Sequence, residues 1–391
     1  MSDFIKTQDD DGVATITWNC VDRPMNVMSE QGFSDLNALV DDCIADDTIS
    51  GVIITSAKKD FAAGMDLGVI AKTKEKNPEN PAQGCFEMVM QIHQILRKIE
   101  LAGMDFKSKK GGKPFVAVLP GTALGIGLEI PLACHHIIAS NNSKAKIGLP
   151  EIKVGIFPGA GGTTRLVRKM GAMGASPFLL EGKLSNPSAA KAAGLIDAVS
   201  DQPLADAKSW ILAATDADLV KVWDAKGYKM PGGAPYHPAG FMTFVGASAM
   251  VNGNTLGVYP AAKALLSAVY EGALVPFDTA LKIEARHFTS VLVNPSSSNM
   301  IRSLFLNKGA LEKGAVRPDG IPDQSVQKVG IMGAGMMGAG IALVTAQAGI
   351  DVVLIDQAQD SADKGKAYVA SYCDKGIKRK KTTIEQKTAL L

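Results

Sequence analysis

Two stretches with almost no charge constrain the fold of this chain more than any other feature. Residues 329–350 contain no charged side chain, and residues 115–134 contain only Glu129. Length alone would allow either stretch to cross a membrane. The first holds six glycines, however, and the second holds three glycines and two prolines, whereas a lipid-facing backbone needs continuous hydrogen bonding. Both stretches therefore predict an apolar strand, a glycine turn and a helix, and we expect no transmembrane segment.

The composition is typical of a folded protein in a reducing compartment. The 391 residues are 46% hydrophobic and 20% charged, which is enough material for about two or three domains. The net charge of +2 provides no field for nucleic acid, so we expect no nucleic-acid partner. Five widely spaced cysteines disfavour a disulfide framework or a zinc module, and we expect no bound metal. The acidic N-terminus lacks a targeting signal, which predicts a cytoplasmic protein.

Short apolar or β-branched runs alternate with helical patterns in the first half of the chain. The runs that predict strands cover residues 12–18, 51–55, 115–119 and 136–139. The apolar spacing over residues 31–45 and 86–99 predicts helices, which makes this part of the chain α/β. Residues 205–314 have a helical character, and Asp278 is predicted to cap an amphipathic helix. The polar Pro/Gly stretch 317–327 predicts a linker.

Glu129 and Glu151 stand out because each lies in apolar, glycine-rich sequence. Three segments of this kind follow one another along the chain, at residues 61–67, 121–129 and 147–163. An ionised carboxylate is costly to bury without a partner or a task. Buried carboxyls with shifted pKa values are candidates for acid–base catalysis. The two glutamates are therefore the candidate catalytic pair.

In this order, the three segments resemble the crotonase, or enoyl-CoA hydratase, superfamily, with a similarity that covers about residues 10–200. The resemblance implies a spiral of ββα turns that binds an acyl-CoA thioester. It implies that the backbone N–H groups of Met65 and Ile126 form an oxyanion hole, which would stabilise charge on the thioester oxygen. It also implies that Glu129 and Glu151 are the catalytic glutamates. The residues implied for CoA binding are Met25, Ala62, Gly64, Asp66 and Leu67.

For the chemistry, the resemblance implies syn hydration of a trans-2-enoyl-CoA to a 3-hydroxyacyl-CoA. Both glutamates would hold the water; one accepts its proton and the other supplies a proton to the α-carbon. Members of the superfamily that only isomerise a double bond usually keep the carboxylate at Glu151 and lack the other, so the presence of both favours hydration. Two positions depart from the pattern. Ile126 replaces a usual glycine and would be strained at positive φ, and Met65 replaces a smaller residue and would narrow the acyl pocket.

A second pattern, G-x-G-x-x-G, occurs at Gly333, Gly335 and Gly338, directly after an apolar run. A helical stretch, a second apolar run and Asp356 follow it. Strand, glycine turn, helix, strand and terminal acid are the elements of a dinucleotide-binding βαβ unit. The glycines let a pyrophosphate approach the helix N-terminus. Asp356 favours the ribose of NAD over the phosphorylated ribose of NADP.

The two patterns together resemble the α-subunit family of the fatty-acid β-oxidation complex, which fuses an enoyl-CoA hydratase to a 3-hydroxyacyl-CoA dehydrogenase. Segments 259–272, 276–280 and 305–307 add to this resemblance. It implies that Met337 and Asp356 contact NAD, that a thiolase β-subunit is a partner, and that the chain belongs to an oligomer.

The resemblance divides the chain into a crotonase-like hydratase domain (1–200), a helical extension (201–316) and the N-terminal part of an NAD-binding dehydrogenase domain (326–391). The family's dehydrogenase uses a His–Glu pair well beyond the glycine loop, but no histidine follows His287. We therefore expect an incomplete Rossmann-type segment that cannot oxidise a hydroxyacyl-CoA.

Two other functions fit the sequence. A Δ3-Δ2 enoyl-CoA isomerase would need Glu151 but not Glu129, and a non-catalytic assembly subunit would dock a thiolase through its helices. Other residues that invite a functional interpretation have simpler ones. The isolated histidines His93 and His287 are predicted on helix faces or in loops, and Cys134 is predicted in the core.

Overall fold

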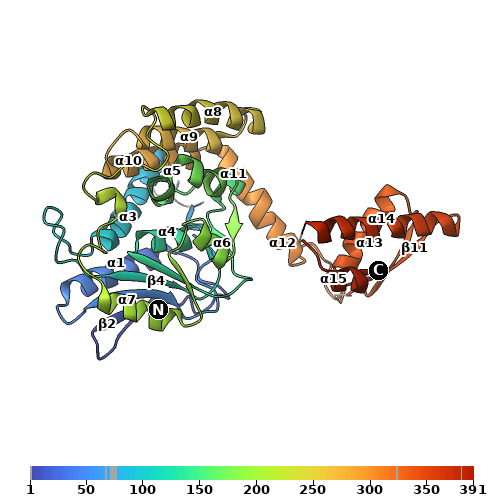
Figure 1. The fold of residues 1–391 in the computed structure, drawn as a ribbon, viewed down its shortest axis with the longest axis horizontal. Helices are drawn as coiled ribbons and strands as arrows, with labels where there is room; N and C mark the ends of the chain where they lie inside the picture. Colours follow the sequence, from blue (N-terminus) through green and yellow to red (C-terminus); the bar gives the residue numbers. More distant parts are fainter. Residues whose placement is uncertain (1, 67, 71–76, 323–324, 380) are drawn as a thin grey trace. The chain divides into compact units, whose positions relative to one another are not determined.

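The computed structural model describes residues 2–66, 68–70, 77–322, 325–379 and 381–391. The chain divides into two compact units, Met1–Lys313 and Gly314–Leu391 (Figure 1). Each unit has its own sheet and its own buried cluster, so each is described by itself. Within the described residues, no helix combines the length and the apolar character needed to cross a membrane.

A mostly parallel sheet organises the larger unit. Its strands are β1 (Phe4–Gln8), β2 (Val13–Trp18), β3 (Gly51–Ser56), β4 (Phe115–Leu119), β6 (His136–Ser140) and β9 (Ala198–Ser200), in the order β1-β2-β3-β4-β6-β9. Only the β1–β2 pair is antiparallel. A second sheet joins β5 (Ala123–Leu124), β7 (Ile147–Gly148) and β8 (Leu184–Ser185). The four predicted strands correspond to β2, β3, β4 and β6, whereas β1, β5, β7, β8 and β9 were not predicted.

Helices cover both faces of the main sheet, which explains why β4 is buried at every position. The helices of this unit are α1 (Glu30–Ala45), α3 (Pro81–Leu101), α4 (Ile126–Ala133), α5 (Gly162–Leu180), α6 (Pro187–Ala192), α7 (Pro203–Ala213), α8 (Pro238–Thr255), α9 (Pro260–Gly272), α10 (Phe277–Leu292), α11 (Pro295–Ile301) and α12 (Lys308–Glu312). The unit also contains two 3-10 helices, η1 (Glu151–Val154) and η2 (Val222–Asp224), and a π-helix, η3 (Arg302–Asn307). Val116 and Val118 of β4 pack with α7 on one face, whereas Phe115, Ala117 and Leu119 join the main core on the other.

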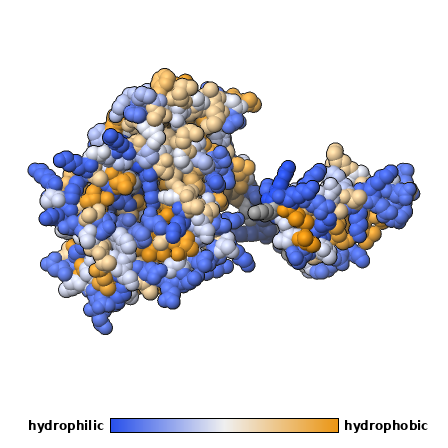
Figure 2. Space-filling view, in the orientation of Figure 1, coloured by the Kyte–Doolittle hydropathy of each residue, from blue (hydrophilic) through white to orange (hydrophobic). Residues whose placement is uncertain are grey.

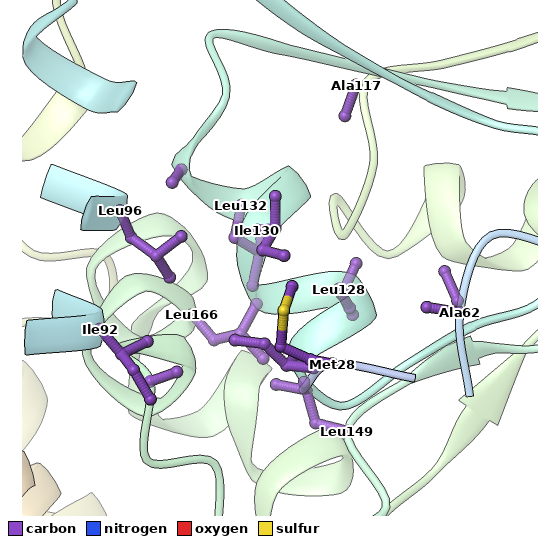
Figure 3. Close-up of a cluster of buried hydrophobic side chains, with 14 of the residues drawn as sticks. Met28, Ala62, Ile92, Leu96, Ala117, Leu128, Ile130, Leu132, Leu149 and Leu166 are labelled. Carbon is purple, nitrogen blue, oxygen red and sulfur yellow. The ribbon is translucent and has the colours of Figure 1, made fainter. Parts of the chain in front are cut away.

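The short helix α4 lies in the middle of that core, and all eight of its residues are buried. Leu128, Ile130 and Leu132 point from α4 into a cluster of apolar side chains that includes Met28, Ile92, Leu96, Leu149 and Leu166 (Figure 3). Gly127 of α4 lies directly against Ala62, because an added Cβ would come within 2.7 Å of the Ala62 Cβ. A helix packed on all sides holds its one acid, Glu129, in a fixed place.

The layer of α8, α9 and α10 lies over α5 and α3 (Figure 1). Helix α10 begins at Phe277 with Pro276 at its N-cap, so the prediction that Asp278 caps this helix is wrong. Asp278 lies in the first turn, where an acid is favourable next to the helix N-terminus. Its Oδ1 accepts a hydrogen bond of 2.9 Å from Nε of Arg97 on α3.

A buried ionic network ties these helices together. Arg165 of α5 is fully buried, and its Nε donates to Oε1 of Glu100 on α3 at 2.8 Å. Arg97 donates to the other Glu100 oxygen at 3.1 Å and to both oxygens of Asp224 at 2.6 and 2.8 Å. The network therefore fixes α5, whose N-terminus borders Glu129, against α3.

In its described residues, the smaller unit is a two-stranded parallel sheet with three helices. Strands β10 (Lys328–Met332) and β11 (Asp351–Ile355) pair directly, and the helices are α13 (Met336–Gln347), α14 (Gln359–Lys378) and α15 (Ile384–Leu390). Ala339 and Leu343 of α13 pack against Val369 and Cys373 of α14. The charge-free stretch thus contains the strand, glycine turn and helix that its sequence predicted.

Glu100→Gln should lower the free energy of unfolding of the full chain by about 3–5 kcal/mol, because Arg165 would stay buried without its counter-charge. Glu312→Gln is the matched control, since Glu312 pairs with Lys308 at the surface and should change stability by at most ~0.5 kcal/mol. Urea denaturation followed by circular dichroism measures both. Equal effects of the two substitutions would contradict a stabilising role for the buried network.

Candidate functional site

A cavity of about 350 Å³ opens between α3, α4, η1 and α10 of the larger unit. Apolar side chains form most of its wall: Ile70, Met88, Val89, Ile92, Phe157, Phe288, Leu292 and Phe305. Among the described residues that line it, the carboxyl groups are those of Glu129 and Glu151. Its size and its few polar groups among apolar ones are typical of a pocket for a small organic ligand.

Glu129 reaches this cavity from α4 and is held by backbone donors. Its Oε1 accepts the N–H of Ala160 at 2.9 Å and the N–H of Gly162 at 2.8 Å. Position 162 must be glycine for this contact, because an added Cβ would lie 2.6 Å from that oxygen. Burial raises the pKa of Glu129 well above its ordinary value, and the negative charge of Glu151 raises it further.

Glu151 reaches the cavity from the first position of η1. Its carboxyl lies against Gly125, where an added Cβ would be 2.9 Å from Oε1. Its Oε2 is buried, and no described residue hydrogen-bonds to it. Burial raises the pKa of Glu151 to about 7. An unpartnered carboxyl oxygen in a cavity is available to a bound molecule.

The two carboxyls repel each other when both are ionised, as the effect of Glu151 on the pKa of Glu129 indicates. At neutral pH the pair therefore resists double ionisation. Such a pair contains both a base and an acid on the wall of one cavity, which is the requirement for moving a proton on and off a substrate.

Met65 and Ile126 both line the same cavity. Met28 donates to the Gly64 oxygen and accepts from the Asp66 N–H, each at 2.9 Å. Since N–H groups alternate along an extended strand, the N–H of Met65 points to the opposite side. Ile126 is the first residue of α4, so its N–H has no partner within the helix. Within the described chain, neither N–H donates to a protein acceptor.

The strain expected at Ile126 does not arise. The preceding residue, Gly125, takes the positive φ of 57° as the N-cap of α4, and Ile126 has ordinary helical geometry. A β-branched side chain is tolerated there, and Ile126 contributes to the cavity wall beside Met65.

The predicted CoA-binding residues lie in different surroundings. Gly64 lines the cavity, whereas Ala62 is fully buried against Gly127 and belongs to the core. Met25 is half-buried, and Asp66 pairs with Arg23 at 2.7 Å. Leu67 lies outside the described residues. Their part in CoA binding stays a prediction.

The roles of two buried polar residues near the site were not predicted from the sequence. His93 lies on a helix, α3, as the sequence prediction allowed, but it is 1% exposed and its Nε2 lies 2.7 Å from the Gly159 oxygen. Glu284 of α10 is also 1% exposed. The signal for Glu284 was its helical spacing, because it falls on the apolar side of α10 with Leu281 and Phe288.

The glycine turn of the smaller unit has room for a ligand. An added Cβ at Gly338 would lie 1.7 Å from the Gly333 oxygen, so turn and helix approach closely there. At Gly333 and Gly335, by contrast, an added Cβ would meet no atom within 4 Å. Gly335 is the N-cap of α13, and Met337 is its exposed second residue. An open turn at a helix N-terminus fits a pyrophosphate.

Asp356 follows β11 and braces this turn. Its Oδ2 accepts the Ala334 N–H and its Oδ1 the Gln357 N–H, both at 2.7 Å. These hydrogen bonds, that from Ala334 above all, lower the pKa of Asp356, so the carboxylate is ionised at neutral pH. Each oxygen keeps a second lone pair for a ribose hydroxyl. The residues present therefore fit NAD.

The Glu151→Gln variant should become more stable than the wild type as the pH rises. The pKa of Glu151 is raised in the folded state, so the wild type loses stability from the unfolded pKa near 4.5 up through about 7, whereas Gln does not titrate. The difference in unfolding free energy should favour the variant by on the order of 3 kcal/mol at pH 8. Thermal unfolding at pH 4 and pH 8 measures this, and a difference independent of pH would show that Glu151 is not destabilised by burial.

Both units are similar to families of known proteins. A family model described as "Enoyl-CoA hydratase/isomerase" matches residues 8–215, and one described as "3-hydroxyacyl-CoA dehydrogenase, NAD binding domain" matches residues 328–391. A fatty acid oxidation complex subunit alpha from Shewanella amazonensis is 30% identical over 390 residues, which are 99% of this chain and 53% of that protein. The chain spans about half the length of the curated relatives it matches.

Solved structures show the same fold. An enoyl-CoA hydratase/isomerase from Xanthobacter autotrophicus Py2 is 20% identical with a TM-score of 0.52, over 81% of this chain and 99% of that one. An enoyl-CoA hydratase from Bacillus halodurans is 19% identical with a TM-score of 0.52, over 77% and 99%. The larger unit therefore has the crotonase fold that the sequence predicted. The enoyl-CoA hydratase/isomerase model matches more than half of the residues of the whole chain, so the chain belongs to this family.

Proposed function

We propose that this chain catalyses the syn hydration of trans-2-enoyl-CoA thioesters to 3-hydroxyacyl-CoA, as a step of fatty-acid β-oxidation. The observation that carries the proposal is the presence of two carboxyls, Glu129 and Glu151, in one apolar cavity beside two free N–H groups. The names of the relatives support the metabolic role.

The N–H groups of Met65 and Ile126 would donate hydrogen bonds to the thioester oxygen. Addition to the β-carbon moves negative charge onto that oxygen, and fixed donors stabilise it without reorganising. One such donor is typically worth ~2.7–4 kcal/mol of transition-state energy. The first free N–H groups of α4 carry the positive end of its dipole, which adds to this stabilisation.

The carboxyl pair would transfer the protons during hydration. The ionised glutamate accepts a proton from water as the water oxygen bonds to the β-carbon, while the protonated glutamate gives its proton to the α-carbon. The C=C π bond is consumed, and the pair again holds one proton at the end. Because both carboxyls lie on the wall of one cavity, H and OH would add to the same face of the substrate.

The apolar wall would hold the acyl chain and keep other water away. Ile92, Phe288 and Leu292 come from α3 and α10 and meet in this cavity. A low-dielectric wall strengthens both the carboxyl interaction and the oxyanion hydrogen bonds.

A Δ3-Δ2 enoyl-CoA isomerase is the alternative from the same family, and it would not require Glu129. The two backbone hydrogen bonds that hold the Glu129 carboxyl at the cavity favour the hydratase. A non-catalytic assembly subunit is the alternative from another class. It is favoured by the exposed apolar side chains of α8, among them Phe241, Met242 and Val245 (Figure 2).

Crotonyl-CoA separates these functions. The full chain should consume the enoyl-thioester absorbance, and Glu129→Gln and Glu151→Gln should each lower kcat by ~10²–10⁴ because each removes one half of the acid–base pair. Glu271→Gln, on the surface of α9, is the control with unchanged turnover. A variant Glu129→Gln that still isomerises a 3-enoyl-CoA would identify an isomerase, and wild-type inactivity would favour the assembly subunit.

We further propose that the smaller unit binds NAD through Gly333, Gly335, Gly338, the Met337 N–H and Asp356. When bound, NAD supplies the oxidant for a hydroxyl-bearing substrate. This chain's own residues would seat the pyrophosphate at the N-terminus of α13 and bind the ribose through Asp356.

NADH should bind the full chain more tightly than NADPH, since Asp356 repels a ribose phosphate. Gly338→Ala should weaken NADH binding by about tenfold or more, because its Cβ would push the turn away. Gly340→Ala is the control, since its Cβ would meet nothing within 4 Å. Titration followed by NADH fluorescence measures these affinities. Equal NADH affinities for the two alanine variants would show that the glycine turn is not the binding site.

A further inference from the structure

Glu284 is a buried carboxyl for which the acid–base chemistry has no use. It lies on α10 and is 1% exposed, yet it is absent from the described residues that line the cavity. Its Oε1 accepts the Gly161 N–H at 2.6 Å, and its Oε2 accepts the N–H and the hydroxyl of Thr164 at 2.7 and 2.6 Å. Three donors satisfy the hydrogen-bonding capacity of this buried carboxyl, so its position is well fixed.

Glu284 and Glu129 share one turn of backbone. The N–H groups of Ala160 and Gly162 bond to Glu129, whereas those of Gly161 and Thr164 bond to Glu284. These donors form the N-terminus of α5, which has Gly161 as its N-cap. Four neighbouring donors are thus divided between two carboxyls from helices far apart in sequence. A displacement of the turn would move the Glu129 carboxyl with it.

Other contacts fix the turn as well. Gly161, with a φ of 94°, and Gly162 have no side chains but are closely packed, because an added Cβ would lie 1.8 Å from Nη1 of Arg165 and 2.6 Å from Oε1 of Glu129, respectively. Thr163 Oγ1 bonds back to the Pro158 oxygen at 2.8 Å within the same loop. Arg165 donates to the Ala160 oxygen at 3.2 Å. On the α10 side, the described hydrogen bonds to the turn are those of Glu284.

Charged groups surround this pair on several elements. His93 of α3 lies 3.7 Å from Glu284 Oε1, with its Nε2 on the Gly159 oxygen. Arg165 of α5 pairs with Glu100 of α3, and Glu151 and Lys153 border the cavity from η1. On α9, Glu271 pairs with Arg286 and His287. The negative charge of Glu284, like that of Glu151, raises the pKa of Glu129.

We propose that Glu284 is a positioning residue for hydration, which holds the N-terminal turn of α5 in the place that fixes the Glu129 carboxyl at the cavity. The proposal rests on the proposed hydratase function. It differs from a purely structural role because the loss of Glu284 should change what Glu129 does, as well as how stable the chain is.

Glu284→Gln tests this in the full chain. Gln keeps the size, but its amide nitrogen would face a donor of Gly161 or Thr164, so one hydrogen bond to the turn is lost. We expect kcat for crotonyl-CoA to fall by roughly 10- to 100-fold with KM within about threefold, since small misplacements of a reacting group have effects of this size. The pH–rate profile should also change, because the charge of Glu284 and the two backbone hydrogen bonds to Glu129 both affect the pKa of Glu129.

Glu271→Gln is the matched control, a glutamate of the adjacent helix that pairs at the surface. Its kcat and pH profile should equal those of the wild type. If Glu284→Gln lowers the unfolding temperature but keeps the wild-type kcat and pH profile, Glu284 is structural only and the proposal is wrong.

Two milder variants keep the test decisive if Glu284→Gln does not fold. Thr164→Val removes only the hydroxyl that donates to Glu284, and kcat should fall by about threefold to tenfold with KM unchanged. Thr289→Val, on α10 itself, is the control, because the Thr289 hydroxyl is buried without a partner among the described residues. Equal kcat values for the two valine variants would overturn the proposal.

Crystal structures separate this proposal from the hydratase function. In Glu284→Gln, or in Thr164→Val, the distances from Glu129 Oε1 to the Ala160 and Gly162 nitrogens should lengthen beyond roughly 3.5 Å, the limit of a hydrogen bond. Unchanged distances would overturn the positioning role, whatever the activity. An inactive wild type whose variants show the lengthened distances would refute the hydratase function and leave the positioning of Glu129 supported.

Discussion

The repulsion between two carboxyls in one apolar cavity is the constraint on which the rest of this site depends. Burial alone raises the pKa values of Glu129 and Glu151, and their mutual repulsion raises that of Glu129 further. Water would relieve both effects at a surface, but an apolar wall does not. The pair is therefore kept part-protonated at neutral pH. Burying it lowers the stability of the fold, but it places an acid and a base in the same cavity.

The surrounding fold maintains that arrangement with rigid elements. Helix α4 holds Glu129 from within the core, and the N-terminal turn of α5 binds its carboxyl. The Arg165–Glu100 pair and Glu284 then fix α5 from α3 and α10. The C-terminal helices of the larger unit are thus part of the support of the site, although the two carboxyls that face the cavity come from residues before them.

Local patterns predicted the elements because local forces decide them. The run 115–119 became β4 without change, and the glycine turn before Glu129 became the N-cap of α4. The expectation of strain at Ile126 was wrong by one position, since Gly125 takes the positive φ. Glu284 and the buried contact of His93 were missed because their hydrogen-bond partners lie 123 and 66 residues away, respectively. Periodicity can place such a side chain on a buried face, but it cannot identify the backbone group with which that side chain forms a hydrogen bond.

The stereochemistry of hydration tests most directly whether both carboxyls serve one face of the substrate. Crotonyl-CoA hydrated by the full chain in D2O should give a 3-hydroxybutyryl-CoA with one deuterium at the α-carbon. Its coupling to the β-hydrogen in the proton NMR spectrum should correspond to addition of deuterium and hydroxyl to the same face. A product of anti addition, or an equal mixture of the two α-configurations from the first turnovers, would contradict the account.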